Sequence, residues 1–291
     1  MIRLAVRVRR AQAEVVLAEL LELAPAGVEE VHVDEDILEF ALYGAPGELP
    51  SLPDLNAVAG GALVEISTTH TPDDWQERWK QFHRPILIQP PPVAGPHAVP
   101  AIRIRPPWEP AEAQSVRDQQ EIVIDPGQAF GTGGHATTRL CLELLLGLPA
   151  LSPARGPVID VGTGSGVLAI AAARLGFAPV LGLDHERESV AAARANAIVN
   201  EVDIEVRHFD LRDDALPSFD PRERPLILAN LLQPLLMELA RSLSRPPEHL
   251  IAGGLLVHEV DQVVRAFQGR LGLRERERRR RGEWAAVWLT V

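Results

Sequence analysis

The sequence predicts an α/β protein in which a mostly parallel sheet follows a smaller α+β domain. From residue 158 onward, short apolar runs of strand length alternate with stretches of helical spacing, the pattern of a parallel sheet covered by helices. A buried run at 158–161 leads directly into glycines at 162, 164 and 166, which is typical of a nucleotide-binding turn. The first seventy residues instead show strand and helix patterns in a βαββαβ-like order.

Residues 1–70 are therefore expected to form a small ferredoxin-like domain without a catalytic group of side chains. Its expected elements are strands at 2–8, 28–33, 37–42 and 62–66 and helices at 13–23 and 52–58. This part holds twelve acidic residues and four arginines, and so carries most of the net charge of −11. A solvated acidic surface is the commoner cause of such a charge bias; the functional alternative is a domain that docks a basic partner.

Three further segments complete the expected domain order. Residues 71–84 are expected to form a linker helix, with Thr71 as N-cap and Trp75 and Trp79 on one face. Residues 85–125 are expected to form a joining segment, because nine prolines between 85 and 110 interrupt regular structure around one short strand at 102–104. Residues 126–291 would then form the larger domain.

The spacing of the glycine turn favours a nucleoside without a pyrophosphate. A dinucleotide fingerprint reads Gly-x-Gly-x-x-Gly, whereas Gly162, Gly164 and Gly166 follow a Gly-x-Gly-x-Gly pattern led by Asp160. The next apolar run, 179–183, ends in Asp184, whose carboxylate could accept both ribose hydroxyls. This combination suits S-adenosylmethionine. Nicotinamide dinucleotides are disfavoured by the spacing.

The rest of the larger domain repeats the same pattern. Expected strands are 204–209, 226–229, 249–257, 273–281 and 284–291, and expected helices are 167–175, 187–199, 234–243 and 262–271. Ligands bind at the carboxyl ends of parallel strands, where Asp160, Asp184, Asp210 and Asn230 should lie.

The stretch 124–139 carries four glycines, a histidine and three threonines before a helix expected at 140–146. Such a loop offers donors at a helix N-terminus and could fold over the same pocket. The alternative is an ordinary loop with Thr137 or Thr138 as N-cap.

Composition excludes several classes of site and compartment. Cys141 is the single cysteine, so an internal disulfide or a multi-thiolate metal site is excluded. The sequence contains no His-x-x-x-His pair, so a histidine metal site has little support. No apolar run reaches transmembrane length, and a cytoplasmic monomer without direct nucleic-acid binding is expected. The arginine-rich stretch 274–281 is interpreted as a solvated edge strand, with contact to ribosomal RNA or an acidic patch as the alternative.

The motifs resemble those of the bacterial methyltransferases that modify large-subunit ribosomal protein eleven, the PrmA family. The resemblance rests on four stretches: the loop 125–139, the turn 160–170, Gly182-Leu183-Asp184, and Ala229-Asn230-Leu231-Leu232. It covers nearly the whole chain, with departures at Leu232 and Gln233 and at Val257-His258-Glu259-Val260.

The resemblance implies a recognition domain, a linker, and a class I Rossmann-like methyltransferase domain with a seven-stranded, mostly parallel sheet. It implies methyl transfer from S-adenosylmethionine to lysine side chains and the N-terminal amine of the ribosomal protein. Family cofactor contacts fall on Thr138, Gly162, Asp184 and Asn230. The full set of candidate cofactor residues adds Phe130, Gly131, Thr132, Asp160, Gly164, Gly166 and Asp210.

The expected chemistry is displacement of the sulfonium methyl group by a neutral amine. We hypothesise that Asn230 orients the amine and that His135, or a water in the loop, receives its proton. One alternative is a methyltransferase for adenine or glutamine amides, which is disfavoured because Leu231 and Leu232 stand where those enzymes have prolines and no aromatic residue follows. The other is a non-catalytic module that binds the cofactor or the ribosomal protein.

Overall fold

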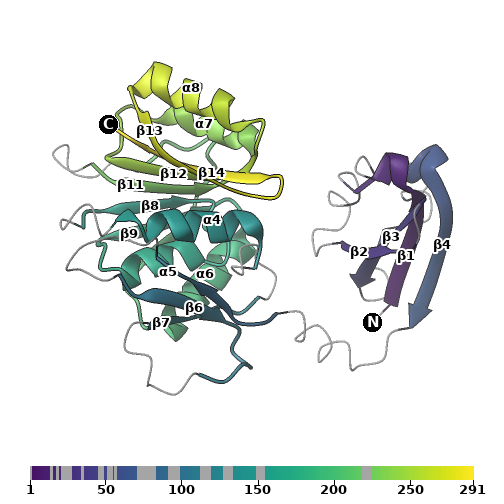
Figure 1. Cartoon of the computed structure of the whole chain (residues 1–291). Coiled ribbons are helices and arrows are strands. Elements are labelled where there is room, and N and C mark those ends of the chain that lie inside the picture. The colour runs from purple at the N-terminus through teal and green to yellow at the C-terminus, as the bar shows by residue number, and fades with distance from the viewer. Residues whose placement is uncertain are drawn as a thin grey trace. The chain divides into compact units, whose positions relative to one another are not determined.

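The chain divides into two compact units, Met1–Phe82 and His83–Val291 (Figure 1). The computed structural model describes residues 2–13, 16–17, 20, 28–33, 36–44, 49–50, 55, 58–70, 83–90, 99–111, 119–126, 134–148, 155–217 and 224–291. The expected linker helix with Trp75 and Trp79 lies almost entirely outside these described residues.

The first unit is built on an antiparallel sheet with the strand order β2-β3-β1-β4. Its strands are β1 (Ile2–Arg9), β2 (Glu29–His32), β3 (Ile37–Gly44) and β4 (Leu63–His70), with 3-10 turns η1 (Arg10–Gln12) and η2 (Gly60–Ala62). Helical residues follow β1, at 13, 16, 17 and 20, and precede β4, at 55, 58 and 59. This order confirms the predicted ferredoxin-like α+β domain.

The second unit contains a seven-stranded sheet with the order β10-β9-β8-β11-β12-β14-β13. Neighbouring strands are parallel except at β14, which runs antiparallel to both β12 and β13. The bounds are β8 (Val158–Val161), β9 (Val180–Asp184), β10 (Glu205–His208), β11 (Leu226–Asn230), β12 (His249–Leu256), β13 (Arg274–Arg281) and β14 (Trp284–Thr290). The predicted mostly parallel α/β sheet is confirmed.

Helices cover both faces of this sheet, as Figure 1 shows. They are α4 (Ala136–Leu145), α5 (Val167–Arg174), α6 (Arg187–Val199), α7 (Gln233–Ser242) and α8 (Val260–Leu271). Alternate residues of each strand point to opposite faces. Val158 therefore packs into one core with α4 and α5, whereas Ile159 packs into the other core with α7 and α8.

Residues 86–123 also belong to this second unit, which differs from the separate joining segment expected at 85–125. They form a second sheet of β5 (Ile86–Ile88), β6 (Ala101–Arg105) and β7 (Gln119–Val123) in that order. Four isoleucines, at 88, 102, 104 and 122, are buried in the same core as α4 and α5. Several of the prolines mark strand ends instead of preventing strands, since Pro85 and Pro90 flank β5 and Pro100 and Pro106 flank β6.

Replacing Ile102 by Ala should destabilise the whole second unit by about 2–5 kcal/mol, because this side chain is fully buried in the shared core. Leu87→Ala, in the neighbouring strand, removes a side chain that is 41% exposed and should change stability by less than about 1 kcal/mol. Urea unfolding of both variants, followed by circular dichroism, measures the difference. Equal stabilities would show that the small sheet is not part of the cooperative unit.

Candidate active site

The glycine turn after β8 has positive φ angles, which residues with a side chain rarely adopt. Gly162, Gly164 and Gly166 have φ values of 74°, 53° and 82°, in the left-handed region. The N–H groups of Gly162 and Thr163 both donate to the Leu183 carbonyl, at 2.8 and 2.9 Å. A Cβ at Gly162 would lie 2.4 Å from Leu231 Cδ2. The turn is thus tied to β9 and packed against the residue that follows Asn230.

The side chain of Asp184, at the carboxyl end of β9, also holds the glycine turn. Its Oδ2 accepts the Gly164 N–H at 2.8 Å, and its Oδ1 accepts the Glu186 N–H at 3.0 Å. The carboxylate lines the pocket beside the turn. A carboxylate has about four lone-pair positions, so both oxygens keep acceptor capacity for ligand hydroxyls.

Asp160 lies beneath the turn and not among the side chains that line the pocket. Its Oδ2 accepts the Thr163 hydroxyl at 2.7 Å and the Ala169 N–H at 3.2 Å. Burial raises the pKa of this carboxyl to about 7, and the nearby negative charge of Asp184 adds to the shift. Asp160 therefore joins the turn to the first helical residues of α5.

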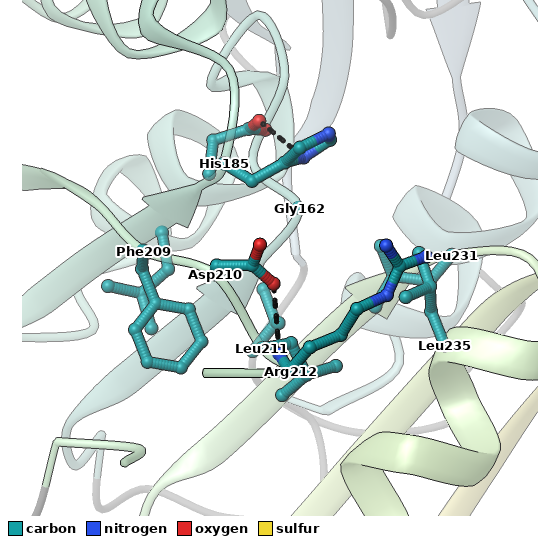
Figure 2. A pocket seen from close by; sticks show the side chains of 11 residues that line it. Gly162, His185, Phe209, Asp210, Leu211, Arg212, Leu231 and Leu235 are labelled. Carbon is teal, nitrogen blue, oxygen red and sulfur yellow. Dashed lines mark hydrogen bonds and ion pairs between the residues drawn. The ribbon is translucent and has the colours of Figure 1, made fainter. Parts of the chain in front are cut away.

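Two adjoining cavities follow the carboxyl ends of the strands. The first is shown in Figure 2 and lies between strands β8, β9 and β10 and the start of α7; its lining side chains include Val161, Leu183, Phe209, Asp210, Leu211, Arg212, Leu231 and Leu235. The second extends along the glycine turn and is lined by residues that include Thr138, Gly164, Val167, Glu186, Ser189 and Asn230. Both cavities share Gly162, Asp184, His185, Leu231 and Leu235, so they lie side by side, and together we call them the groove.

Asp210 lines the first cavity as one of its polar groups. Its Oδ1 accepts the Arg212 N–H at 2.9 Å, and its own N–H donates to Asp214 Oδ2 at 2.9 Å. Figure 2 shows the Asp210 carboxylate between His185 and Arg212. These bonds fix the turn after β10 in a shape that presents a carboxylate beside an apolar wall.

Asn230, at the end of β11, contacts the first turn of α4 at the wall of the second cavity. Its Nδ2 donates to the hydroxyl of Thr138 at 3.3 Å, and its Oδ1 is buried without a hydrogen-bond partner among the described residues. A Cβ at Gly253 would lie 3.0 Å from Asn230 Oδ1 and 2.3 Å from Cys141 Sγ. Sequence reasoning did not identify Gly253, because the requirement for glycine comes from α4, which packs directly over β12 and leaves no room for a Cβ at this position.

His135 is the N-cap of α4, and the helix begins four residues earlier than expected. Its Nδ1 accepts the Thr137 N–H at 3.4 Å and lies 2.9 Å from the Thr137 hydroxyl oxygen. The ring packs edge-on against Trp284, with ring centres 5.0 Å apart, and burial lowers the histidine pKa. The suggested N-caps Thr137 and Thr138 are both inside the helix instead.

Phe130, Gly131 and Thr132 lie outside the described residues, so their proposed cofactor contacts stay predictions. The unusual end of β12 is described. There Glu259 Oε2 accepts the Leu256 N–H at 2.8 Å, and the Val257 N–H donates to the Glu283 carbonyl at 2.9 Å. The departure from the family pattern at 257–260 therefore forms a closed turn joined to the β13–β14 hairpin.

Two buried amides, Asn196 in α6 and Asn200 at its C-cap, join the glycine turn and α6 to the end of β7 and the residues after it. Asn200 accepts the Val123 N–H at 2.8 Å and donates to the Val123 carbonyl at 2.6 Å, which imitates a neighbouring strand. Asn196 accepts the Asp125 N–H at 3.1 Å and donates to the Ser165 carbonyl at 2.8 Å. One amide group thus links two chain segments about forty residues apart.

A family model for ribosomal protein L11 methyltransferase (PrmA) matches residues 54–290. The chain belongs to this family. It is 40% identical to a ribosomal protein L11 methyltransferase of Pelobacter propionicus, over 76% of this chain and 68% of that one. It is 39% identical to one of Heliobacterium modesticaldum, over 74% and 63%. The chain thus spans about two thirds of the length of these curated relatives.

A solved structure has the same fold. The ribosomal protein L11 methylase from Lactobacillus delbrueckii subsp. bulgaricus is 31% identical and superposes with a TM-score of 0.54, covering 65% of this chain and 94% of that chain. The chain is therefore a class I methyltransferase that uses S-adenosylmethionine.

Among the described residues, no helix could cross a membrane. The same residues contain no group of three or more side chains suited to a metal ion.

The effect of the glycine turn on cofactor binding can be separated from backbone strain. Gly166→Ala places a Cβ 3.1 Å from that of Ala193 at a φ of 82°, so the turn must shift; affinity for S-adenosylmethionine should fall at least about tenfold, which is 1.4 kcal/mol. Gly272→Ala imposes a similar φ of 72° in open space, and should cost about 1–2 kcal/mol of stability without changing that affinity. Calorimetric titration of both variants decides the matter; equal cofactor affinities would contradict the assigned role.

Proposed function

We propose that this enzyme transfers methyl groups from S-adenosylmethionine to lysine side chains and the N-terminal amine of ribosomal protein L11. The observation that carries the proposal is the groove that joins Asp184 to Asn230 at the carboxyl ends of β9 and β11 in a chain of this family. Since ribosomal proteins are made in the cytoplasm, we place the reaction there and propose that the enzyme acts as a monomer.

The groove offers a suitable group for each part of the cofactor. Asp184 has acceptor capacity for the two ribose hydroxyls. The apolar wall of the first cavity, formed by Leu183, Phe209 and Leu211, suits a flat base, and Asp210 can accept from its exocyclic amine. Thr138 and Asn230 would then face the amino-acid end and the reacting methyl group.

Methyl transfer forms a bond from carbon to the acceptor nitrogen as the bond from carbon to sulfur breaks. The sulfonium supplies the positive charge, which moves to the nitrogen and leaves as a proton. A lysine amine has an unperturbed pKa of about 10.4, so the site must bind its neutral form. The oxygen atoms of Asn230, in its side chain and backbone, can accept a hydrogen from the amine and so align its lone pair.

The residues after Asn230 favour a flexible amine over a planar acceptor. Leu231 lines both cavities, and the next side chain, Leu232, is 64% exposed. Neither can clamp a base or an amide between a ring and a backbone, whereas both can pack against the methylenes of a lysine.

The first unit supports a basic protein as the acceptor. Glu39 is buried and binds both Arg3 and Arg7, and Arg7 also pairs with Glu65. The first seventy residues hold twelve acidic residues against four arginines, an excess of eight negative charges that suits a basic partner.

The direct test is incubation with radiolabelled S-adenosylmethionine and purified ribosomal proteins, with identification of the labelled protein by mass. Label on L11 lysines and its N-terminal amine is expected, and Asp184→Ala should abolish it by removing the ribose acceptor. Label on RNA or on glutamine would support the planar-acceptor alternative. Cofactor binding without any transfer would support a non-catalytic module.

The proposed base His135 can be tested without losing the helix cap. Asn is also a strong N-cap residue, so His135→Asn should preserve α4 while removing the imidazole. Because burial lowers the pKa of His135, the wild-type rate should show an extra downward bend at a pH below about 6.5, added to the slope from the amine itself. The variant should lack this bend. An unchanged pH–rate profile would contradict the role as base.

A further inference from the structure

Strand β13 is an edge of the seven-stranded sheet and consists of six arginines and two glutamates (Figure 1). Three of its six arginines form ion pairs with nearby carboxylates. Arg278 pairs with Glu275 and Asp261, both at 2.7 Å, and Arg279 pairs with Glu277 at 2.7 Å and Glu143 at 3.4 Å. Arg281 also reaches Glu143, at 3.3 Å. These pairs occupy the four nearby carboxylates.

The other three arginines, Arg274, Arg276 and Arg280, are exposed. They have no hydrogen bond or ion pair from their side chains to any described part of the chain. An eight-residue strand is about 26 Å long at 3.3 Å per residue, so the arginines are spread along this edge of the sheet. Arg274 lies opposite Thr290 and Arg280 opposite Ala285, so these two arginines flank the edge from opposite faces, and Arg276 lies at the register shift between Glu275 and Glu277. This number of arginines is more than protection of an edge requires, since one or two charges already discourage edge pairing.

The C-terminal end of β13 lies at the carboxyl end of the sheet, which is also the end where the groove lies. β13 points in the same direction as β11 and β12, because β14 between them is antiparallel to both of its neighbours. The hairpin after Arg281 accepts the Val257 N–H through the Glu283 carbonyl, and Trp284 packs against His135. Arg280 is therefore near the carboxyl end of the sheet and Arg274 near the opposite end.

Charge is distributed unevenly along the chain. Residues 241–291 hold ten arginines against six acidic residues, whereas residues 1–240 hold nineteen basic against 34 acidic residues. The net charge of −11, which led us to expect no direct nucleic-acid binding, therefore does not describe the surface around β13. At physiological salt, charges farther away than about 8 Å are largely screened, so this local surface decides what binds there.

We propose that β13 binds the sugar-phosphate backbone of RNA, with Arg274, Arg276 and Arg280 as the phosphate contacts. All basic residues of the strand are arginines, whose planar fork binds phosphate oxygens through two parallel hydrogen bonds. RNA presents a continuous row of such groups, which matches guanidinium groups spread along a strand better than the scattered carboxylates of an acidic protein. A protein that binds ribosomal RNA would bring such a backbone beside the active site, although binding to β13 itself does not depend on the acceptor's identity.

The test is fluorescence anisotropy of a labelled RNA hairpin with a single-stranded tail, titrated with the full chain at several salt concentrations. The variant Arg274→Gln/Arg276→Gln/Arg280→Gln removes the three phosphate contacts. It should lower the slope of log affinity against log salt concentration by about 2, at about 0.7 per contact. The control Arg9→Gln/Arg207→Gln/Arg224→Gln makes the same charge change at exposed sites outside β13 and should keep the wild-type slope.

Methyl transfer to free ribosomal protein, measured separately, should be the same in the β13 variant as in the wild type, so this proposal and the proposed acceptor succeed or fail independently. The proposal is overturned if the wild-type chain does not bind the RNA at low salt, or if the two triple variants weaken binding equally. Competition by polyglutamate as effective as that by RNA of equal charge would also overturn it, and would identify an acidic protein surface as the partner.

Discussion

The hydrogen bond from the Gly164 N–H to the Asp184 carboxylate joins the turn after β8 to the end of β9, beside the two cavities at the carboxyl ends of the strands. The three glycines can adopt their left-handed backbone only because this bond and the two bonds to the Leu183 carbonyl hold the turn against β9. In the proposed function, the same carboxylate also accepts the ribose hydroxyls. The strength of the fold at this point and the affinity of the site therefore depend on one side chain.

Helix α6 gives this turn its rigid support. Ala193 packs behind Gly166, and the Asn196 amide holds the Ser165 carbonyl. Asn200, one helical turn further on, binds Val123 in the small sheet as a strand would. The small sheet is thus held beside the glycine turn by these two amides together with the core that it shares with α4 and α5, without a shared strand. This explains how a segment interrupted by prolines can be an integral part of the methyltransferase domain.

The sequence predicted those features that depend on local pattern. The alternation of apolar runs predicted both sheets of the two main domains, and the order of the strands predicted that Asp184, Asp210 and Asn230 would lie at one end of the large sheet, where they line the two adjoining cavities. Their contacts with the cofactor stay predictions. Features that depend on contacts between distant segments were not predictable. Nothing local distinguishes Gly253 from other strand glycines, since its requirement comes from Cys141 on α4. The prolines of 85–125 obscured two of the three short strands, β5 and β7, whereas the strand expected at 102–104 is β6. Similarly, a histidine in a glycine-rich loop suggested a catalytic residue, whereas the described contacts of His135 are those of a helix cap.

The position of β14 has a consequence for the order in which the domain can form during synthesis. This strand is inserted between β12 and β13, although it follows both in the chain. Until residues 284–290 are available, β12 has an unpaired edge, β13 has no partner in the sheet, and the side of α4 that rests on β14 is uncovered. The seven-stranded sheet can therefore be completed only after residues 284–290 have left the ribosome. A nascent chain arrested shortly before Trp284 would display an open strand of eight residues, of the kind that chaperones or a second copy can occupy.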